Sequence, residues 1–252
     1  MKNILFIIIS LQLIISCNEN KTELPIPSSK INNSNLSLEE MVKQHILAQL
    51  SIPSNEKFSY KIYKEHLDGD NKIDAIISVN RLEFALDEAK KSGKYELLKE
   101  LGFTGHYNYF FYFDGGLNKI SPAIVMPSSP ESELKVNFEN ISTAAFKDVL
   151  IDYKIRNSSF RNFYIVSNHT PKQVFQWKIY DHLNEKNIEA NYLEYVTGSY
   201  SLTKDILIYE GNLLNAQNVG NIYKFNPIIS KKNKLLYRFF YLENEGKYFT
   251  KK

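Results

Sequence analysis

Three aspartates in one short stretch are the residues of this chain best placed to do chemistry. Residues 66–74 read HLDGDNKID, so Asp68, Asp70 and Asp74 crowd three carboxylates into a few positions. Hard cations such as Ca²⁺ prefer oxygen ligands carried on a loop that turns sharply. Carboxylates this close repel one another unless a cation or hydrogen-bond donors neutralise them. The spacing therefore predicts either a metal site or a loop whose aspartates cap backbone amides.

The stretch is similar to the D-x-[DN]-x-D-G-x-x-D loops of calcium-binding and integrin-like repeats. By that resemblance, Asp68, Asp70 and Asp74 are carboxylate ligands at the third, fifth and ninth places, and Lys72 offers its backbone carbonyl at the seventh. The resemblance thus implies Ca²⁺ as a cofactor in a structural role. The alternative is a hairpin loop that has the same shape, holds no metal and uses its aspartates as caps.

Two positions depart from the pattern of those loops. His66 stands at the first place, where the loops carry Asp, and Asn71 stands at the sixth, where they carry Gly. Imidazole is a poor ligand for a hard ion, whereas Asn tolerates the left-handed backbone better than most residues. Glu65, directly upstream, is the residue that could partly replace the missing first ligand.

The only cysteine of the chain carries a different chemistry. Cys17 follows Ile-Ile-Ser at 14–16, and an apolar stretch at 4–15 lies behind the single cation Lys2. This arrangement resembles the lipobox of bacterial lipoproteins, and the resemblance covers only the first 17 residues. It implies that residues 1–16 are a signal peptide and that lipid, such as palmitate, is attached to Cys17.

A lipid anchor on Cys17 has consequences for where the protein acts. The apolar stretch fits a signal peptide, because a membrane-spanning helix needs roughly 20 apolar residues. The resemblance therefore implies a cell-envelope protein held on a membrane outside the cytoplasm. Asn18 follows the cysteine in place of Asp, which favours the outer membrane in a cell that has one.

Composition bounds the rest of the chain. Thirty-one Lys and Arg face 28 Asp and Glu, so the chain is near neutral and gives no electrostatic case for a nucleic-acid partner. Residues 17–35 are polar, contain prolines and have no periodicity, which is typical of a flexible tether. We expect residues 36–252 to form a single β-rich domain, and the alternative is a division near the turn-rich residues 127–135.

Two segments have helical periodicity. Residues 38–50 repeat apolar side chains at helical spacing, and Ser37 and Glu40 have the spacing of a capping box. Residues 82–101 form a second, charged helical segment that Ser92-Gly93 could divide in two.

The remaining periodic segments alternate or are apolar in the manner of strands. They are residues 58–62, 74–79, 107–113, 120–126, 149–155, 163–166, 175–179, 192–196, 206–209, 222–225 and 235–242. The spacing favours antiparallel meanders over βαβ units. The fold class we predict is α+β, with mainly antiparallel sheet, an N-terminal helix and one inserted helical segment.

Other chemistry-bearing residues are weaker candidates. His45, His106, His169 and His182 lack the spacing of metal ligands. A polar and aromatic cluster, Asp152-Tyr153-Lys154 opposite residues 161–164, is interpreted as cross-strand packing rather than a ligand site.

No catalytic constellation is recognised, so we expect a non-enzymatic protein that binds an envelope partner or has a structural role. The first alternative is a glycan-binding lipoprotein that uses exposed rings, since Tyr and Phe number 17 and 16 beside the single Trp177. The second is an envelope hydrolase built around Asp68, Asp70 and Asp74. An apolar cleft that converges on these aspartates would favour the hydrolase.

Overall fold

A computed structural model of the chain describes residues 36–250. The predicted signal peptide at 1–16, the acylated Cys17 and the tether at 17–35 lie outside the described residues. Contacts group Ser37–Lys252 into one compact unit. Within the described residues, every helix is too short or too polar to cross a bilayer.

The structure confirms the predicted α+β class. The helices are α1 (Leu38–Gln49), α2 (Leu82–Lys91), α3 (Tyr95–Glu100) and the 3-10 turn η2 (Ala216–Asn218). The first strands are β1 (Ser59–Glu65), β2 (Asp74–Asn80), β3 (Gly105–Asp114), β4 (Lys119–Ile120), β5 (Ile124–Ser128) and β6 (Lys135–Glu139). The later strands are β7 (Asp148–Ile155), β8 (Ser158–Ser167), β9 (Thr170–Asp181), β10 (Glu189–Val196), β11 (Asp205–Leu213), β12 (Ile229–Leu242) and β13 (Lys247–Thr250).

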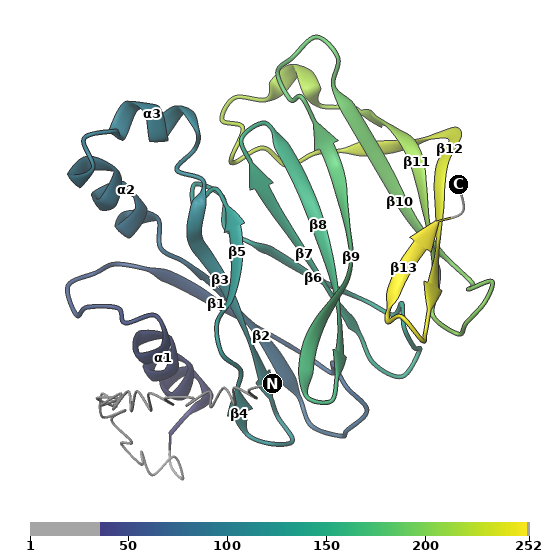
Figure 1. The fold of residues 1–252 in the computed structure, drawn as a ribbon, viewed down its shortest axis with the longest axis horizontal. Helices are drawn as coiled ribbons and strands as arrows, with labels where there is room; N and C mark the ends of the chain where they lie inside the picture. The colour runs from purple at the N-terminus through teal and green to yellow at the C-terminus, as the bar shows by residue number, and fades with distance from the viewer. Residues whose placement is uncertain (1–35, 251–252) are drawn as a thin grey trace, which may run out of the picture. The chain divides into compact units, whose positions relative to one another are not determined.

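The strands form two antiparallel sheets (Figure 1). The five-stranded sheet has the order β1-β2-β3-β4, and β5 also pairs with β3. The eight-stranded sheet runs β13-β12-β11-β10-β9-β8-β7-β6, so its neighbours in space are neighbours in sequence. α2 and α3 are inserted between β2 and β3, as the sequence predicts. The edge strands nearest the N-terminal end of each sheet, β1 and β6, each pair with only one strand of those described.

Both faces of the five-stranded sheet are covered. Ser37 and Glu40 form the predicted capping box, and α1 then packs Val42 and Ile46 on one face of the sheet. The other face packs on β6–β8 through a second cluster that includes Tyr112 and Ile151. Burial at about 25 cal/mol per Å² of apolar surface is the main stabilisation of both layers.

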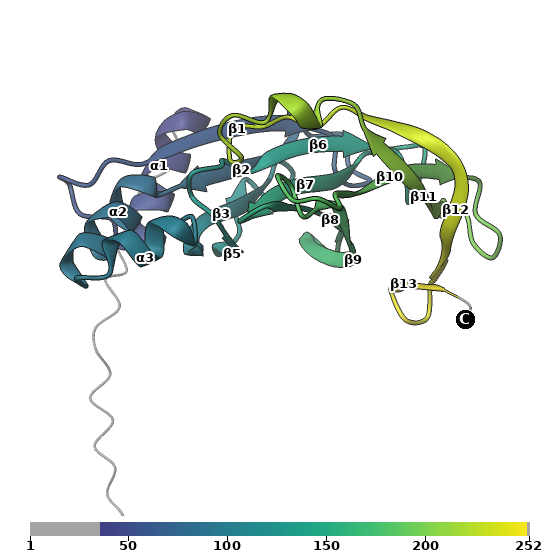
Figure 2. The same ribbon diagram turned by 90° about the horizontal axis from the view of Figure 1, so that it is seen from above.

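The eight-stranded sheet curls on itself (Figure 2). β12 bends so that β13 approaches β9, where the rings of Phe175 and Tyr248 lie 5.5 Å apart. β10 pairs with β9 at only two positions. Along the rest of its length it pairs with β11, so the sheet opens between β9 and β10. Leu150, Phe163 and Phe175 fill the face inside the curl, which we call the curled face.

The sequence-based strand prediction is wrong in one segment, joins two strands in a second and misses two others. Residues 120–126, predicted as one strand, are divided between β4 and β5, since residues 121–123 are not in a strand. Residues 222–225, predicted as a strand, form a turn, because the side chain of Asn221 accepts hydrogen bonds from the amides of Tyr223 and Lys224. The short edge strands β6 and β13 are not predicted. β6 is only five residues long and follows a turn-rich segment, so its alternation is brief.

Candidate functional site

The aspartate loop at residues 66–74 connects β1 to β2, and its carboxylates bind the loop's own backbone. The Oδ1 of Asp68 accepts from the amide of Asp70 at 3.0 Å, and the Oδ1 of Asp70 accepts from the amide of Lys72 at 2.6 Å. Such bonds hold the backbone in tight turns. Upstream, the Glu65 carboxylate accepts from the amide of His66 at 3.0 Å. The loop therefore has the capped arrangement that the sequence leaves open beside metal binding.

Asp74 is the most buried carboxylate of this loop. Its two oxygens accept from the amides of Leu67 and Gly115, each at 3.0 Å, so it ties the loop to the end of β3. Burial raises the pKa of Asp74, and these two amide bonds oppose that rise. An oxygen occupied by an amide is less available to a cation, so Asp74 acts here as a structural anchor.

The structure brings Asp68 together with two residues that the sequence did not connect to it. One ligand atom each of Asp68, Asp114 and His169 lies within 4.8 Å of the others. The Nδ1 of His169 and the Oδ2 of Asp114 are 2.7 Å apart, and Asp114 also accepts from the amide of Leu117. A set of one imidazole and two carboxylates suits a transition metal or zinc better than calcium. The predicted calcium ligands Asp70, Lys72 and Asp74 are not part of this group.

A groove of about 940 Å³ lies elsewhere, between the start of the five-stranded sheet and β7–β8. Its walls come from β1, the segment at 130–135, β7, β8 and the loop at 223–227. Small-molecule sites have volumes of roughly 300–1,000 Å³ and mostly apolar walls with a few polar groups. None of Asp68, Asp70 and Asp74 lines it. The hydrolase alternative requires a cleft that converges on the aspartate loop, and this groove does not converge on it.

An ion pair crosses the curled face beside the groove. Lys135, Asp152 and Arg161 stand directly opposite one another on β6, β7 and β8. Asp152 accepts two hydrogen bonds from Arg161, at 2.6 and 2.8 Å, and Arg161 also reaches the hydroxyl of Tyr195 at 3.3 Å. A bidentate pair of this kind uses both carboxylate oxygens. The side chain of Lys135 forms no ion pair with Asp152, and the Asp152–Arg161 pair joins the two sides of the hairpin that the sequence suggested.

Lys154 ties the β11–β12 connection to the sheet. Its ammonium donates to the carbonyls of Ile222, Tyr223 and Phe225 at 3.2, 2.8 and 2.6 Å. Burial, and secondarily the charge of Lys135, lowers the pKa of Lys154 to about 8. No carboxylate pairs with this ammonium within residues 36–250. Main-chain carbonyls are thus its only hydrogen-bond acceptors there.

Tyr223 of the same connection is fixed by a close approach to the backbone. Gly102 has a φ of 62°, and a Cβ at this position would overlap the phenol of Tyr223. The carbonyl of Gly102 also accepts from the hydroxyl of Ser129 at 2.6 Å. The positive φ and the close approach of the phenol therefore both favour glycine at position 102. The ring of Tyr223 lies at the edge of the groove.

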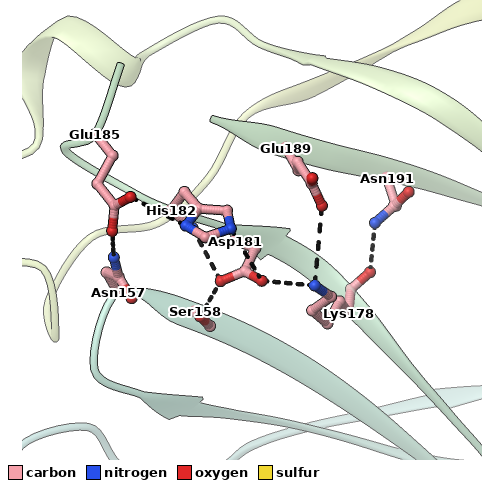
Figure 3. A network of polar contacts seen from close by, with 8 residues as sticks. All are labelled: Asn157, Ser158, Lys178, Asp181, His182, Glu185, Glu189 and Asn191. Atoms are coloured by element: carbon pink, nitrogen blue, oxygen red, sulfur yellow. Dashed lines mark hydrogen bonds and ion pairs between the residues drawn. The ribbon is translucent and has the colours of Figure 1, made fainter. Parts of the chain in front are cut away.

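A polar clamp joins β8, β9 and β10 near the groove (Figure 3). Asp181 accepts from the hydroxyl of Ser158, from the ammonium of Lys178 at 2.5 Å and from the amide of His182 at 2.9 Å. Partial burial would raise the pKa of Asp181, but these donors outweigh it and lower the pKa to about 2. His182 bonds Glu185 through Nδ1, so the hydroxyl of Ser158 faces a carboxylate rather than an imidazole base.

Comparisons of the chain with protein-family models, with curated proteins and with solved structures find no match. The interpretation of the site therefore depends on its own geometry. Sequence reasoning missed the approach of Asp114 and His169, which are 55 residues apart in the chain, and it missed the role of Lys135. Pairing of β6 with β7 is the signal that would have placed Lys135 beside Asp152.

The rings around Trp177 do not form a flat exposed platform. The ring planes of Trp177 and the exposed Tyr237 meet at 62°, and Phe239, at 40° to Tyr237, is buried. Trp177 is parallel to Phe175, with an angle of 3°, but Phe175 is buried. Sugars stack on coplanar exposed rings, so this cluster gives the glycan-binding alternative no support.

Proposed function

We propose that this chain is a lipid-anchored cell-envelope protein that binds a small molecule in the groove between β1 and β7–β8. The observation that carries the proposal is the groove itself, whose volume is about 940 Å³. Tyr153 and Phe225 supply buried apolar wall, while lysines and glutamates supply the polar groups. This combination is typical of a ligand pocket. In this proposal the protein acts by binding its ligand.

The anchor is a separate part of the proposal and comes from the sequence. Cys17 follows Ile-Ile-Ser at 14–16, and residues 1–16 have the length and apolar character of a signal peptide. Several acyl chains on one residue hold a protein on a bilayer far more firmly than one chain does. We therefore place the protein on a membrane facing away from the cytoplasm, and on the outer membrane where the cell has one.

Hydroxyls in the groove support binding rather than acyl transfer. Ser59 donates to Glu133, and Ser159 donates to the main-chain oxygen of Tyr153. Among the described residues that line the groove there is no histidine. A serine nucleophile needs an adjacent base that removes its proton. The hydroxyls of Ser59 and Ser159 therefore donate to a carboxylate and to a main-chain carbonyl, and both of these bonds are structural.

Native mass spectrometry tests whether the groove is occupied. The mature chain is isolated from its own membranes in a mild detergent and is expected to carry a small-molecule mass. Ser132→Trp places an indole at the groove wall and should remove the added mass. Ser167→Trp, at the end of β8 and away from the groove, should keep it. The same added mass on both variants, or none on the unaltered chain, would argue against a ligand in the groove.

Labelling with an alkyne palmitate tests the anchor independently. The unaltered chain should incorporate the label and remain with membranes, and Cys17→Ser should lose both the label and the membrane association. Mass spectrometry should find Cys17 as the first residue of the mature chain. Recovery of Met1 at the amino terminus of the cellular protein would overturn the anchor and leave the groove proposal intact.

A further inference from the structure

Two lysines stand side by side at the groove without a carboxylate. Lys135 lies opposite Asp152 in register, and Lys154 is two residues along β7, so both point to the curled face. Diagonal neighbours of this kind are about 7–8 Å apart. Asp152 is already bidentate with Arg161, and Lys135 has no hydrogen bond or ion pair within residues 36–250. The two positive charges are therefore not neutralised by the protein.

The rest of the groove adds to this excess. Lys61 pairs with Glu133, as Arg161 pairs with Asp152, and these two pairs cancel. The lining groups that remain are Lys57, Lys135, Lys154 and Lys224 against Glu83 and Glu131. Burial raises the pKa of Glu131, partly offset by Lys99 and Lys224. The groove thus favours negative charge, most strongly beside Lys135.

Apolar surface adjoins this charge. Tyr63, Pro227 and Ile229 also line the groove, and each of them is only partly buried. A ligand that satisfied only the lysines would leave this wall in contact with water. Binding would be strongest for a ligand that covers the wall and also places an acidic group beside the lysines.

We propose that the ligand of the groove is an amphipathic anion, a carboxylate or phosphate on an apolar body, with its acidic group beside Lys135 and Lys154. This inference rests on the proposed function, since it names the class of molecule that the groove binds. Lys154 contributes only its positive charge to the ligand, because its three protons are already donated to carbonyls. Lys135 contributes the free donor. The ammonium of Lys135 therefore forms the direct contact, and Lys154 strengthens it electrostatically.

Three probes with one body and different charges test this directly. They are 4-phenylbutyrate, 4-phenylbutanol and 4-phenylbutylammonium, titrated against the mature chain in lipid nanodiscs and followed by saturation-transfer NMR. Empty nanodiscs give the blank for partition into lipid. We expect the anion to bind about tenfold more tightly than the alcohol, and the ammonium to bind least. 4-Phenylbutyl phosphate, which has the same body, distinguishes a phosphate preference from a carboxylate preference.

Two lysine variants separate this charge preference from general attraction. Lys135→Gln should reduce the preference for the anion to about threefold or less, because the free donor is gone. Lys172→Gln removes an exposed lysine of β9 that does not line the groove, and the preference should remain. Both positions are exposed, so both variants should fold.

The results that overturn the inference differ from those that overturn the proposed function. Equal affinity for anion and alcohol, tighter binding of the ammonium, no binding of any probe, or equal effects of the two lysine variants would each reject an anionic ligand. The added mass seen by native mass spectrometry, and its loss in Ser132→Trp, would still stand in those cases. Loss of that mass effect rejects the groove as a binding site altogether.

Discussion

The aspartate loop and the groove treat charge in opposite ways. In the loop, Asp70 and Asp74 are satisfied by main-chain amides, so the protein itself supplies the donors that a cation would replace. In the groove, Lys135 and Lys154 share one face, and no carboxylate balances them within the described residues. Charge that the backbone satisfies maintains a fold, whereas charge left without a counterion beside a cavity attracts a ligand. The more suggestive sequence motif is thus the one whose polar groups the protein itself satisfies.

Replacing Asp74 should produce the largest effect. Asp74→Ala leaves the buried amide of Leu67 and the half-buried amide of Gly115 without acceptors, and each such loss costs roughly 1–3 kcal/mol. We expect the free energy of unfolding to fall by about 2–4 kcal/mol in urea denaturation. Asp70→Ala is the matched control, because its amide partner on Lys72 is exposed to water. Similar losses for the two variants would show that Asp74 is not the anchor of the loop.

Replacing Lys154 should come next. Lys154→Met keeps the length of the side chain but removes three hydrogen bonds to the carbonyls of Ile222, Tyr223 and Phe225. The expected loss is about 1.5–3 kcal/mol, the range for one hydrogen bond to a charged group, because removing the buried ammonium also removes its desolvation cost. Lys135→Met, which breaks no bond in the described chain, should change stability by less than about 0.5 kcal/mol. Equal losses would mean that both lysines are structural, and the contrast between loop and groove would disappear.

Periodicity predicted most of the fold because most elements have one buried face. The capping box at Ser37 and the break near Ser92-Gly93 were both predicted from local residues, and local interactions form both. Residues 222–225 were predicted as a strand because apolar residues gather there. In the structure, Asn221 and Lys154 take up the polar groups of that backbone. A contact from a distant strand overrides local propensity, and a single sequence does not show it.

The candidate site was less predictable than the fold. Asp152 and Arg161 were correctly placed together across a hairpin, since their separation is local. Their relation to Lys135 depends on β6, a strand too short to recognise by alternation. His169 meets Asp114 only because the two sheets pack together. Sites that combine segments from two sheets require tertiary structure, whereas a contiguous loop such as residues 66–74 attracts attention regardless of what it does.

Acid should weaken the clamp that holds the strands beside the groove. The pKa of Asp181 is lowered to about 2, so its contribution to stability is complete above the usual aspartate pKa and is lost as the pH falls from about 4 to about 2. Water screens the pair with Lys178, so we expect less than about 1 kcal/mol. Unfolding at pH 5 and pH 3 measures it, with Asp181→Asn as the comparison. A variant with the same acid sensitivity as the unaltered chain would assign the loss to other carboxylates.

Calcium should have the smallest effect of all. Asp70 and Asp74 already accept from amides, and Asp68 faces Asp114 and His169 instead of the other predicted ligands. A bound ion stabilises the folded state by RT ln(1 + [ion]/Kd), and a chain of this length shifts its Tm by roughly 2–4 °C per kcal/mol. We expect millimolar calcium to raise the Tm by less than about 1 °C, measured by calorimetry against magnesium as a control. A rise of several degrees that Asp68→Asn removes would restore the calcium prediction, and the loop would then depend on a ligand as much as the groove does.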